Sequence, residues 1–304
     1  MRPFADRLAA AIRAKRSAAC VGLDPDPALI PRVLFRGTGR SEPARTLGAI
    51  ARFNAVVLDI AASRVPCVKP QVAFYERWGP AGLAVFAATL SRARELGLLA
   101  IADVKRGDVP GTAKAYAAAY FAGDGLGFPC DAVTLSPYLG SDSVEPWLEA
   151  AAKAGGGMFF LVRTSNPGAR ELQDLRCGRS RFYLETARLV RSWSERLRGR
   201  CGYSGVGAVV GATYPAEARL LRKRLPHSFF LLPGLGSQGG KASDLAPVFD
   251  ERGLGALVSA SRSAIFPWHS SPYRERFGAP RWERAIEAAI DDMNAAIEAV
   301  RRAR

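Results

Sequence analysis

The sequence predicts a single-domain (β/α)8 TIM barrel that spans residues 1–304. Short apolar runs alternate with longer helical patterns along the whole chain, and eight such pairs match the size of this fold class. The runs are almost continuously apolar, as expected for parallel strands that are covered on both faces. No Ser-, Gly- or Pro-rich linker divides the chain. An open doubly wound sheet is the alternative, but no GxGxxG motif follows the first run.

The elements are expected in strict alternation after an amphipathic helix at the N-terminus. The expected strands are 18–23, 67–71, 98–104, 132–135, 158–162, 207–210, 229–232 and 256–259. The helices expected to follow them are 43–64, 80–96, 112–122, 144–154, 181–198, 215–223, a short 242–249 and a long 281–302. Segments 34–45 and 265–280 have the composition of insertions and are expected to be ordered surface loops.

Composition limits the class of protein. No apolar run approaches the ~20 residues that a membrane span needs, and the first residues carry no apolar signal segment, so we expect a cytoplasmic protein. The five cysteines are odd in number and form no CxxC pair, which disfavours a disulfide framework or a structural zinc site. Only His227 and His269 are present, so a His-rich metal site is excluded.

The formal net charge of +15 would suit a nucleic-acid-binding protein. The arginines are, however, scattered over the expected helices, and no basic block with interleaved aromatic residues occurs. We therefore expect no nucleic-acid partner, although a basic surface would attract an anionic substrate.

The stretch 103–108 concentrates ionisable side chains at the end of an expected strand. Alternate residues of a strand face the same side, so Asp103 and Lys105 should point together into one site. Asp108 lies beyond the strand, where a loop could carry it into the same site or into that of a neighbouring subunit. Such clusters create the local fields that catalysis uses, but a solvated surface salt bridge is the plain alternative.

Polar residues collect at the C-terminal end of every expected strand, where the active sites of these barrels lie. In chain order they include Asp24, Lys69, Gln71, Asp103, Lys105, Ser136, Tyr138, Arg163 to Asn166, Thr213, Ser237, Gln238 and Ser259 to Arg262. The N-terminal ends carry much less of this chemistry.

The last two strand ends have the features of a phosphate site. Gly234, Gly236, Gly239 and Gly240 allow the backbone to approach a ligand closely. Arg262 follows at the next strand end, where its guanidinium could bind phosphate oxygens in a forked geometry. Barrels often bind phosphate between these two loops, although a tight turn beside a surface arginine would look the same.

In this order, the motifs of the chain resemble the orotidine 5′-phosphate decarboxylase family, specifically its longer bacterial subgroup (type 2). The matching segments are 21–25 (VGLDP), 68–71 (VKPQ), 103–108 (DVKRGD), 163–169 (RTSNPGA), 210–215 (VGATYP), 232–240 (LPGLGSQGG) and 261–262 (SR). The Asp-x-Lys-x-x-Asp pattern alone is shared with sugar-phosphate relatives, whereas the ordered set is specific.

The resemblance implies a carboxy-lyase that converts orotidine 5′-monophosphate to UMP, the last step of de novo UMP synthesis, without a metal ion or an organic cofactor. Lys105 would donate the proton that replaces the departing carboxylate, and Asp103 would lie beside that carboxylate. Lys69 and Asp108 would complete an alternating Lys–Asp–Lys–Asp array that keeps Lys105 protonated.

The resemblance also assigns the substrate contacts and a homodimer. Asp108 and Thr112 would reach the partner's site. Asp24 and Lys69 would bind the ribose hydroxyls, and Ser165 would bind the pyrimidine. Gln238 and Arg262 would hold the 5′-phosphate. The remaining substrate-binding positions implied are Pro233, Gly239 and Ser261.

Two other functions stay open from the sequence. A hexulose-phosphate synthase or a keto-gulonate-phosphate decarboxylase would use related Asp and Lys positions with a divalent metal, and Glu76 is the one extra carboxylate near Lys69 in the sequence. A basic barrel that binds nucleic acid or a phosphate ligand without catalysis is supported only by the net charge.

Overall fold

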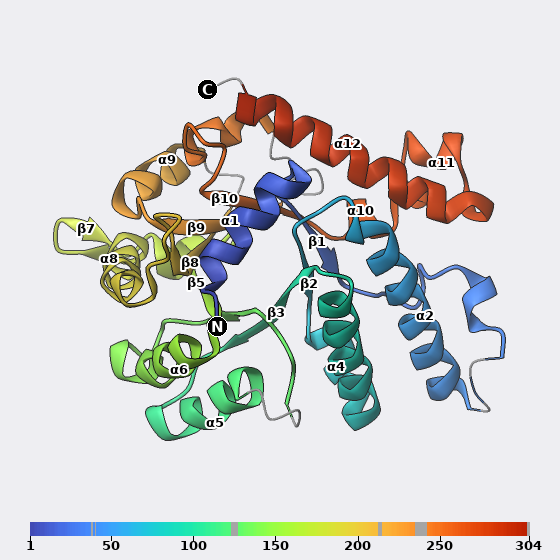
Figure 1. The fold of residues 1–304 in the computed structure, drawn as a ribbon, viewed down its shortest axis with the longest axis horizontal. Coiled ribbons are helices and arrows are strands. Elements are labelled where there is room, and N and C mark those ends of the chain that lie inside the picture. The colour runs from blue at the N-terminus through green and yellow to red at the C-terminus, as the bar shows by residue number, and fades with distance from the viewer. Residues whose placement is uncertain (38, 40, 123–126, 212–214, 235–241, 303–304) are drawn as a thin grey trace.

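A closed parallel barrel forms the body of the protein. The structure is a computed structural model that describes residues 1–37, 39, 41–122, 127–211, 215–234 and 242–302. Within these residues, parallel strands close in the order β1-β10-β9-β8-β5-β4-β3-β2, and β1 pairs with both β2 and β10 (Figure 1). The predicted (β/α)8 barrel is confirmed, and an open sheet is excluded because no barrel strand has an unpaired edge.

The barrel strands agree closely with the predicted runs. They are β1 Ala19–Leu23, β2 Cys67–Pro70, β3 Leu99–Arg106, β4 Ala132–Leu135, β5 Gly157–Arg163, β8 Ser204–Val210, β9 Ser228–Pro233 and β10 Ala256–Ala260. The largest differences are at β8, which begins three residues before the predicted start, and at β3, which continues two residues past the predicted end.

Helices connect the strands on the outside of the barrel (Figure 1). The helices of at least ten residues are α1 Phe4–Lys15, α2 Glu42–Ala62, α4 Gly79–Glu95, α5 Pro110–Phe121, α6 Ser141–Ala154, α8 Phe182–Ser194, α9 Pro215–Arg224 and α12 Trp282–Arg302. Local sequence sets their ends. Ser41 caps α2 by accepting the N–H of Ala44 at 3.4 Å, and Gly155 ends α6 with φ of 62°.

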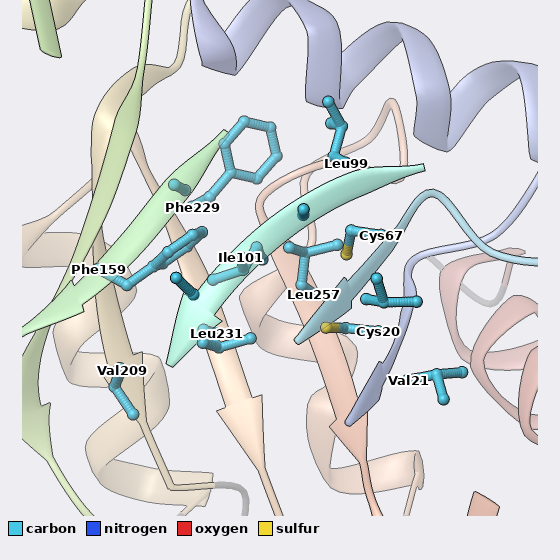
Figure 2. Packing of buried hydrophobic residues seen from close by; sticks show 14 of the residues in the cluster. Cys20, Val21, Cys67, Leu99, Ile101, Phe159, Val209, Phe229, Leu231 and Leu257 are labelled. Atoms are coloured by element: carbon cyan, nitrogen blue, oxygen red, sulfur yellow. The ribbon is translucent and has the colours of Figure 1, made fainter. Parts of the chain in front are cut away.

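The interior of the barrel is apolar, which explains why the strands are continuous apolar runs. Figure 2 shows side chains from most of the strands packed together, with the rings of Phe159 and Phe229 among them. Gly207 of β8 leaves room for this packing, because a Cβ there would lie 2.5 Å from the Phe159 ring. This packed core fixes the strands, so that their C-terminal residues meet at one end.

The N-terminal end of the barrel is covered by α1. Arg7 forms an ion pair with buried Asp131 and donates to the carbonyl of Gly155 at 3.0 Å. Asp6 accepts the backbone N–H of Cys201 at 2.7 Å. These partners precede β4, β5 and β8, so α1 ties together the end opposite the predicted site.

Two connections contain short elements that differ from the prediction. The segment after β5 contains an unpredicted helix, α7 Ala169–Gln173, and an unpredicted hairpin of β6 Arg176–Cys177 and β7 Ser180–Arg181. The helix expected at 242–249 is the 3-10 helix η3 Ala242–Val248. Each of these elements is short, and local patterns of a few residues carry little periodicity.

The segment 265–280 was expected to be a surface loop, and this is wrong for its first half. It contains α10 Arg262–Ile265, η4 Pro267–His269, α11 Tyr273–Arg276 and η5 Ala279–Arg281. Phe266 and Trp268 are buried, and Phe266 stacks on Phe53 of α2 with ring centroids 5.0 Å apart. These aromatic side chains are buried because they pack against α2 and α12, outside the barrel interior.

The remaining short elements lie beside larger ones. They are η1 Arg32–Phe35, α3 Ala73–Glu76 and η2 Glu195–Leu197. In the part of the chain that the structure describes, no helix combines the length and apolar character required to cross a membrane. The five cysteines are free thiols in the structure.

Candidate active site

Two lysines flank one buried aspartate at the C-terminal end of the barrel. Lys69 on β2 places its Nζ 2.5 Å from Oδ2 of Asp103 on β3. Lys105, two residues further along β3, places its Nζ 2.6 Å from Oδ1 of the same carboxylate. Asp103 is 5% exposed, whereas the Lys105 side chain is 45% exposed. The ammonium of Lys105 is therefore accessible to a ligand, whereas the Asp103 carboxylate that pairs with it is buried.

The electrostatics of the array favour charged groups. Burial opposes the charge of Asp103, but the ammonium groups of Lys69 and Lys105 more than offset it and hold the pKa of Asp103 well below its usual range. Burial likewise disfavours the charged form of Lys69. The carboxylates of Asp103 and Asp24 outweigh this effect, so the pKa of Lys69 is raised above its usual range.

The backbone around Lys105 is irregular. Lys105 has φ of 46°, in the left-handed region that residues other than glycine rarely adopt. The ladder between β3 and β4 also shifts its register here, between Ala102 and Arg106. The hydroxyl of Thr134 on β4 lies inside this irregularity and donates to Oδ1 of Asp103 at 2.8 Å.

Asp24 follows β1 and faces the array. Its Oδ1 is buried and has no hydrogen-bond partner among the described residues. Buried carboxylate oxygens normally accept hydrogen bonds, so this atom is suited to a donor group of a ligand. The structure thus places Asp24 and Lys69 on the same side of the site, as the sequence predicted.

Asp108 does not join the array within one chain. It accepts the backbone N–H of its neighbour Val109 at 2.8 Å and forms no ion pair with Lys69 or Lys105 among the described contacts. Thr112 is exposed on the first turn of α5. Both residues lie on the rim beyond β3, outside the cluster that Lys69 and Asp103 form.

Ser165 lies in the loop after β5, which is held by side chains of α7. Gln173 accepts the backbone N–H of Thr164 at 2.9 Å and donates to its Oγ1 at 2.7 Å. Gly211, at the end of β8, allows the close approach of this loop, since a Cβ there would lie 3.1 Å from the Cα of Ser165. The backbone that carries Ser165 is therefore held close to the end of β8.

The predicted phosphate side is more open. Pro233 ends β9 and is the register partner of Ser259 on β10. Ser261 packs against Gly22, where a Cβ would lie 2.0 Å from the serine Oγ. Arg262 is exposed and lines a cavity of about 460 Å³ together with residues of the 263–273 segment. The predicted phosphate ligands Gln238 and Gly239 lie outside the described residues.

Glu76 is the carboxylate because of which a metal-dependent sugar-phosphate enzyme remained an alternative function. In the structure it forms an ion pair with Arg106. The guanidinium of Arg106 also lies over the ring of Tyr116, 5.4 Å from its centroid. A cation at Glu76 would have to compete with this guanidinium. Within the described residues, no group of three His, Cys, Asp or Glu side chains has the arrangement of a metal site.

Sequence reasoning missed two polar residues of this region, Thr134 and Gln173. Thr134 is the only polar residue in the apolar run 132–135, and this was the signal that could have identified it. Gln173 gave no such signal, because the helix that carries it was not predicted.

The comparisons with known proteins agree on one family. The model described as "Orotidine 5'-phosphate decarboxylase / HUMPS family" matches residues 17–263. An orotidine 5'-phosphate decarboxylase of Rhodopirellula baltica is 41% identical over 297 residues, covering 97% of this chain and 98% of that protein. One of Clostridium novyi is 38% identical over 255 residues, covering 84% of this chain and 86% of that protein.

Solved structures give the same result. The OMP decarboxylase of Leishmania donovani superposes with a TM-score of 0.75 and 29% identity, covering 99% of this chain and 100% of that one. The UMP synthase of the same organism superposes with a TM-score of 0.78 and 30% identity over 100% of this chain, which spans only 57% of the UMP synthase. The chain belongs to the orotidine 5′-phosphate decarboxylase / HUMPS family.

Proposed function

We propose that this protein decarboxylates orotidine 5′-monophosphate to UMP, the last step of de novo UMP synthesis. The family model alone also covers sugar-phosphate enzymes, but the relatives that are 38–41% identical over most of the chain are named orotidine 5′-phosphate decarboxylases. The single observation that carries the proposal is the half-exposed ammonium of Lys105, held 2.6 Å from buried Asp103.

Lys105 is proposed as the proton donor. The bond between pyrimidine C6 and the carboxylate breaks, CO₂ leaves, and the electron pair stays on C6. The ammonium of Lys105 then transfers a proton to C6, which forms the new C–H bond, and the resulting neutral amine is reprotonated by solvent. A fixed ammonium stabilises the negative charge as it develops, which is where electrostatic catalysis acts.

Asp103 and Lys69 are proposed to hold that ammonium in place. Asp103 accepts from both lysines, and its charge disfavours the substrate carboxylate in the ground state. Stabilisation of the transition state by the fixed ammonium is the larger expected effect. No metal ion or organic cofactor takes part in the proposed reaction.

The substrate is proposed to lie across the C-terminal end of the barrel. Asp24 and Lys69 bind the ribose hydroxyls, which fits the buried and unsatisfied Oδ1 of Asp24. Ser165 binds the pyrimidine. Arg262 holds the 5′-phosphate with the help of Pro233, Gln238, Gly239 and Ser261, and the exposed position of Arg262 just after β10 supports this role.

A homodimer is proposed to complete the site. Within one chain, Asp108 accepts a hydrogen bond from the neighbouring Val109 N–H and lies with Thr112 on the rim of the barrel. Val109, Tyr138 and Leu139 on the same rim are large apolar residues with exposed fractions of 53%, 71% and 44%. A second copy that covers them would bring its Asp108 to the Lys105 of the first, which supplies the fourth member of the charge array.

Residues 1–304 are proposed to act as one domain, since α12 packs against α2 and β1 of the barrel. The proposed location is the cytoplasm. The direct test is the ultraviolet absorbance of orotidine 5′-monophosphate after addition of enzyme in EDTA. A fall that matches formation of UMP supports the proposal. Unchanged absorbance, or activity that disappears with EDTA and returns with a divalent metal, would refute it and favour the metal-dependent relatives.

A further inference from the structure

The catalytic strand β3 is bulged where it carries Asp103 and Lys105. Ala102 is in register with Val133 and Arg106 with Leu135, so β3 advances four residues while β4 advances two. Three residues of β3 therefore lie opposite Thr134 alone. The regular ladder of backbone hydrogen bonds cannot continue through such a bulge.

The hydroxyl of Thr134 replaces the missing ladder. Its Oγ1 accepts the backbone N–H groups of Val104 and Lys105, each at 3.0 Å, and donates to Oδ1 of Asp103 at 2.8 Å. A hydroxyl offers one donor and two acceptor sites, so all its capacity is used here. Thr134 is 1% exposed, and water cannot substitute for these bonds without a rearrangement.

These three bonds fix the two features on which Lys105 depends. The bond from the Lys105 N–H holds a backbone with φ of 46°, which an L-residue disfavours. The bond to Asp103 sets the rotation of its carboxylate, so that Oδ1 faces Lys105 and Oδ2 faces Lys69. The Thr134 hydroxyl thus fixes both the backbone from which the Lys105 side chain extends and the orientation of the Asp103 carboxylate that pairs with it.

We propose that Thr134 is a positioning residue for the proposed decarboxylation, acting through its hydroxyl on Asp103 and on the backbone of Lys105. This inference rests on the proposed function. Thr134 need not touch the substrate. Its loss should displace the Lys105 ammonium from the reacting carbon, whereas Asp24 and Arg262, which form no bond to Thr134 among the described contacts, should stay in place.

Thr134→Val and Thr134→Ser separate the hydroxyl from the shape of the side chain. Valine keeps the branched shape and loses the hydroxyl, whereas serine keeps the hydroxyl. Thr186→Val is a matched control, because Thr186 is also a buried threonine and, among the described contacts, its hydroxyl bonds only the carbonyl of Phe182 within α8. The measurements are kcat and KM for orotidine 5′-monophosphate, the affinity for UMP and the thermal unfolding midpoint.

We expect Thr134→Val to lower kcat by roughly 10²-fold, the effect of a misplacement of about 1 Å. UMP affinity should stay within about threefold, because UMP has no carboxylate at the position beside Lys105. Thr134→Ser should restore most of kcat, and Thr186→Val should leave it unchanged. If Thr134→Val does not fold, Thr134→Ala takes its place, with the same expected loss of kcat.

The proposal is overturned if Thr134→Val keeps kcat near the wild-type value, or if the Ser and Val variants lose it equally. Absence of turnover in the wild-type enzyme would instead refute the proposed function. In that case, a crystal structure of Thr134→Val decides on the positioning role. The role is supported if Lys105 leaves the left-handed region and refuted if Lys105 stays there with the Asp103 carboxylate unrotated.

Discussion

The two sides of the candidate site are built differently. On the side of β2, β3 and β4, Asp103 is 5% exposed and accepts hydrogen bonds from Lys69, Lys105 and Thr134. On the side of β10, the guanidinium of Arg262 is exposed and has no hydrogen bond or ion pair with the described residues. The groups proposed for the chemistry are thus fixed before substrate binds, whereas the described residues leave the Arg262 guanidinium available for a ligand.

This difference indicates a division of roles. Fixed charges lower a barrier because they need no reorganisation during the reaction. An exposed guanidinium instead gains its partners when an anion arrives, and the energy of that contact can orient a ring at a distance. Substitutions on the two sides should therefore change different kinetic constants.

Lys105→Ala should give the largest effect. Loss of the proton donor and of its charge should lower kcat on the order of 10⁴-fold. UMP affinity should persist, because the ribose and phosphate contacts remain. Steady-state turnover and calorimetric titration with UMP measure the two quantities. A variant that turns over normally would contradict the assignment of Lys105 as the proton donor.

Arg262→Ala should mainly raise KM, by roughly 10²-fold, because it removes charge-assisted hydrogen bonds to the phosphate. Arg274→Ala is the matched control, since Arg274 is exposed in the same connection and pairs with Glu275 instead. The control should keep the wild-type KM. An unchanged KM in Arg262→Ala would remove the phosphate role and with it the proposed division between the two sides.

Much of the barrel and of the charged side was predictable from the sequence. Apolar runs identified the strands because both faces of a parallel barrel are buried. Alternation along β3 predicted that Asp103 and Lys105 lie together. The structure brings them together, although through a bulge rather than through regular alternation. The polar ends of the strands placed Lys69 and Asp24 at the same end of the barrel.

The irregular features were not predictable. The bulge of β3 depends on the pairing of β3 with β4, which no local pattern encodes. Thr134 stood out only as the single polar residue of the run 132–135, and no local pattern indicated what its hydroxyl would bind. The aromatic residues of 265–280 were assigned to the surface because their burial partners lie on α2, far away in the sequence.

Hybrid dimers test whether the charged side is complete in one chain. When Lys105→Ala and Asp108→Ala subunits exchange freely, half of the dimers are hybrids. One of the two sites in each hybrid has both native residues, so activity should recover to about a quarter of the wild-type value. Each parent alone should be far less active. Absence of recovery, with exchange proven by differently tagged subunits, would show that the two residues do not act across subunits.

The smallest effect concerns stability in acid, to which the charged side of the site should contribute and the Arg262 side should not. Because the pKa of Asp103 is lowered in the folded protein from its usual 3.8, the unfolded chain binds more protons as the pH falls below that value. This contribution to the free energy of unfolding is present above pH 3.8 and is lost as the pH decreases, with a slope of up to about 1.4 kcal/mol per pH unit.

Asp103→Asn should remove this part of the acid dependence, and Arg262→Ala should retain it, because arginine keeps its charge throughout the range. Urea unfolding of the wild type and both variants between about pH 2 and pH 5 measures the slopes on both sides of the usual aspartate pKa. Equal slopes for the wild type and Asp103→Asn would mean that the ammonium groups do not stabilise the folded carboxylate. The proposed difference between the fixed charges beside β2, β3 and β4 and the exposed Arg262 beside β10 would then lose its electrostatic basis.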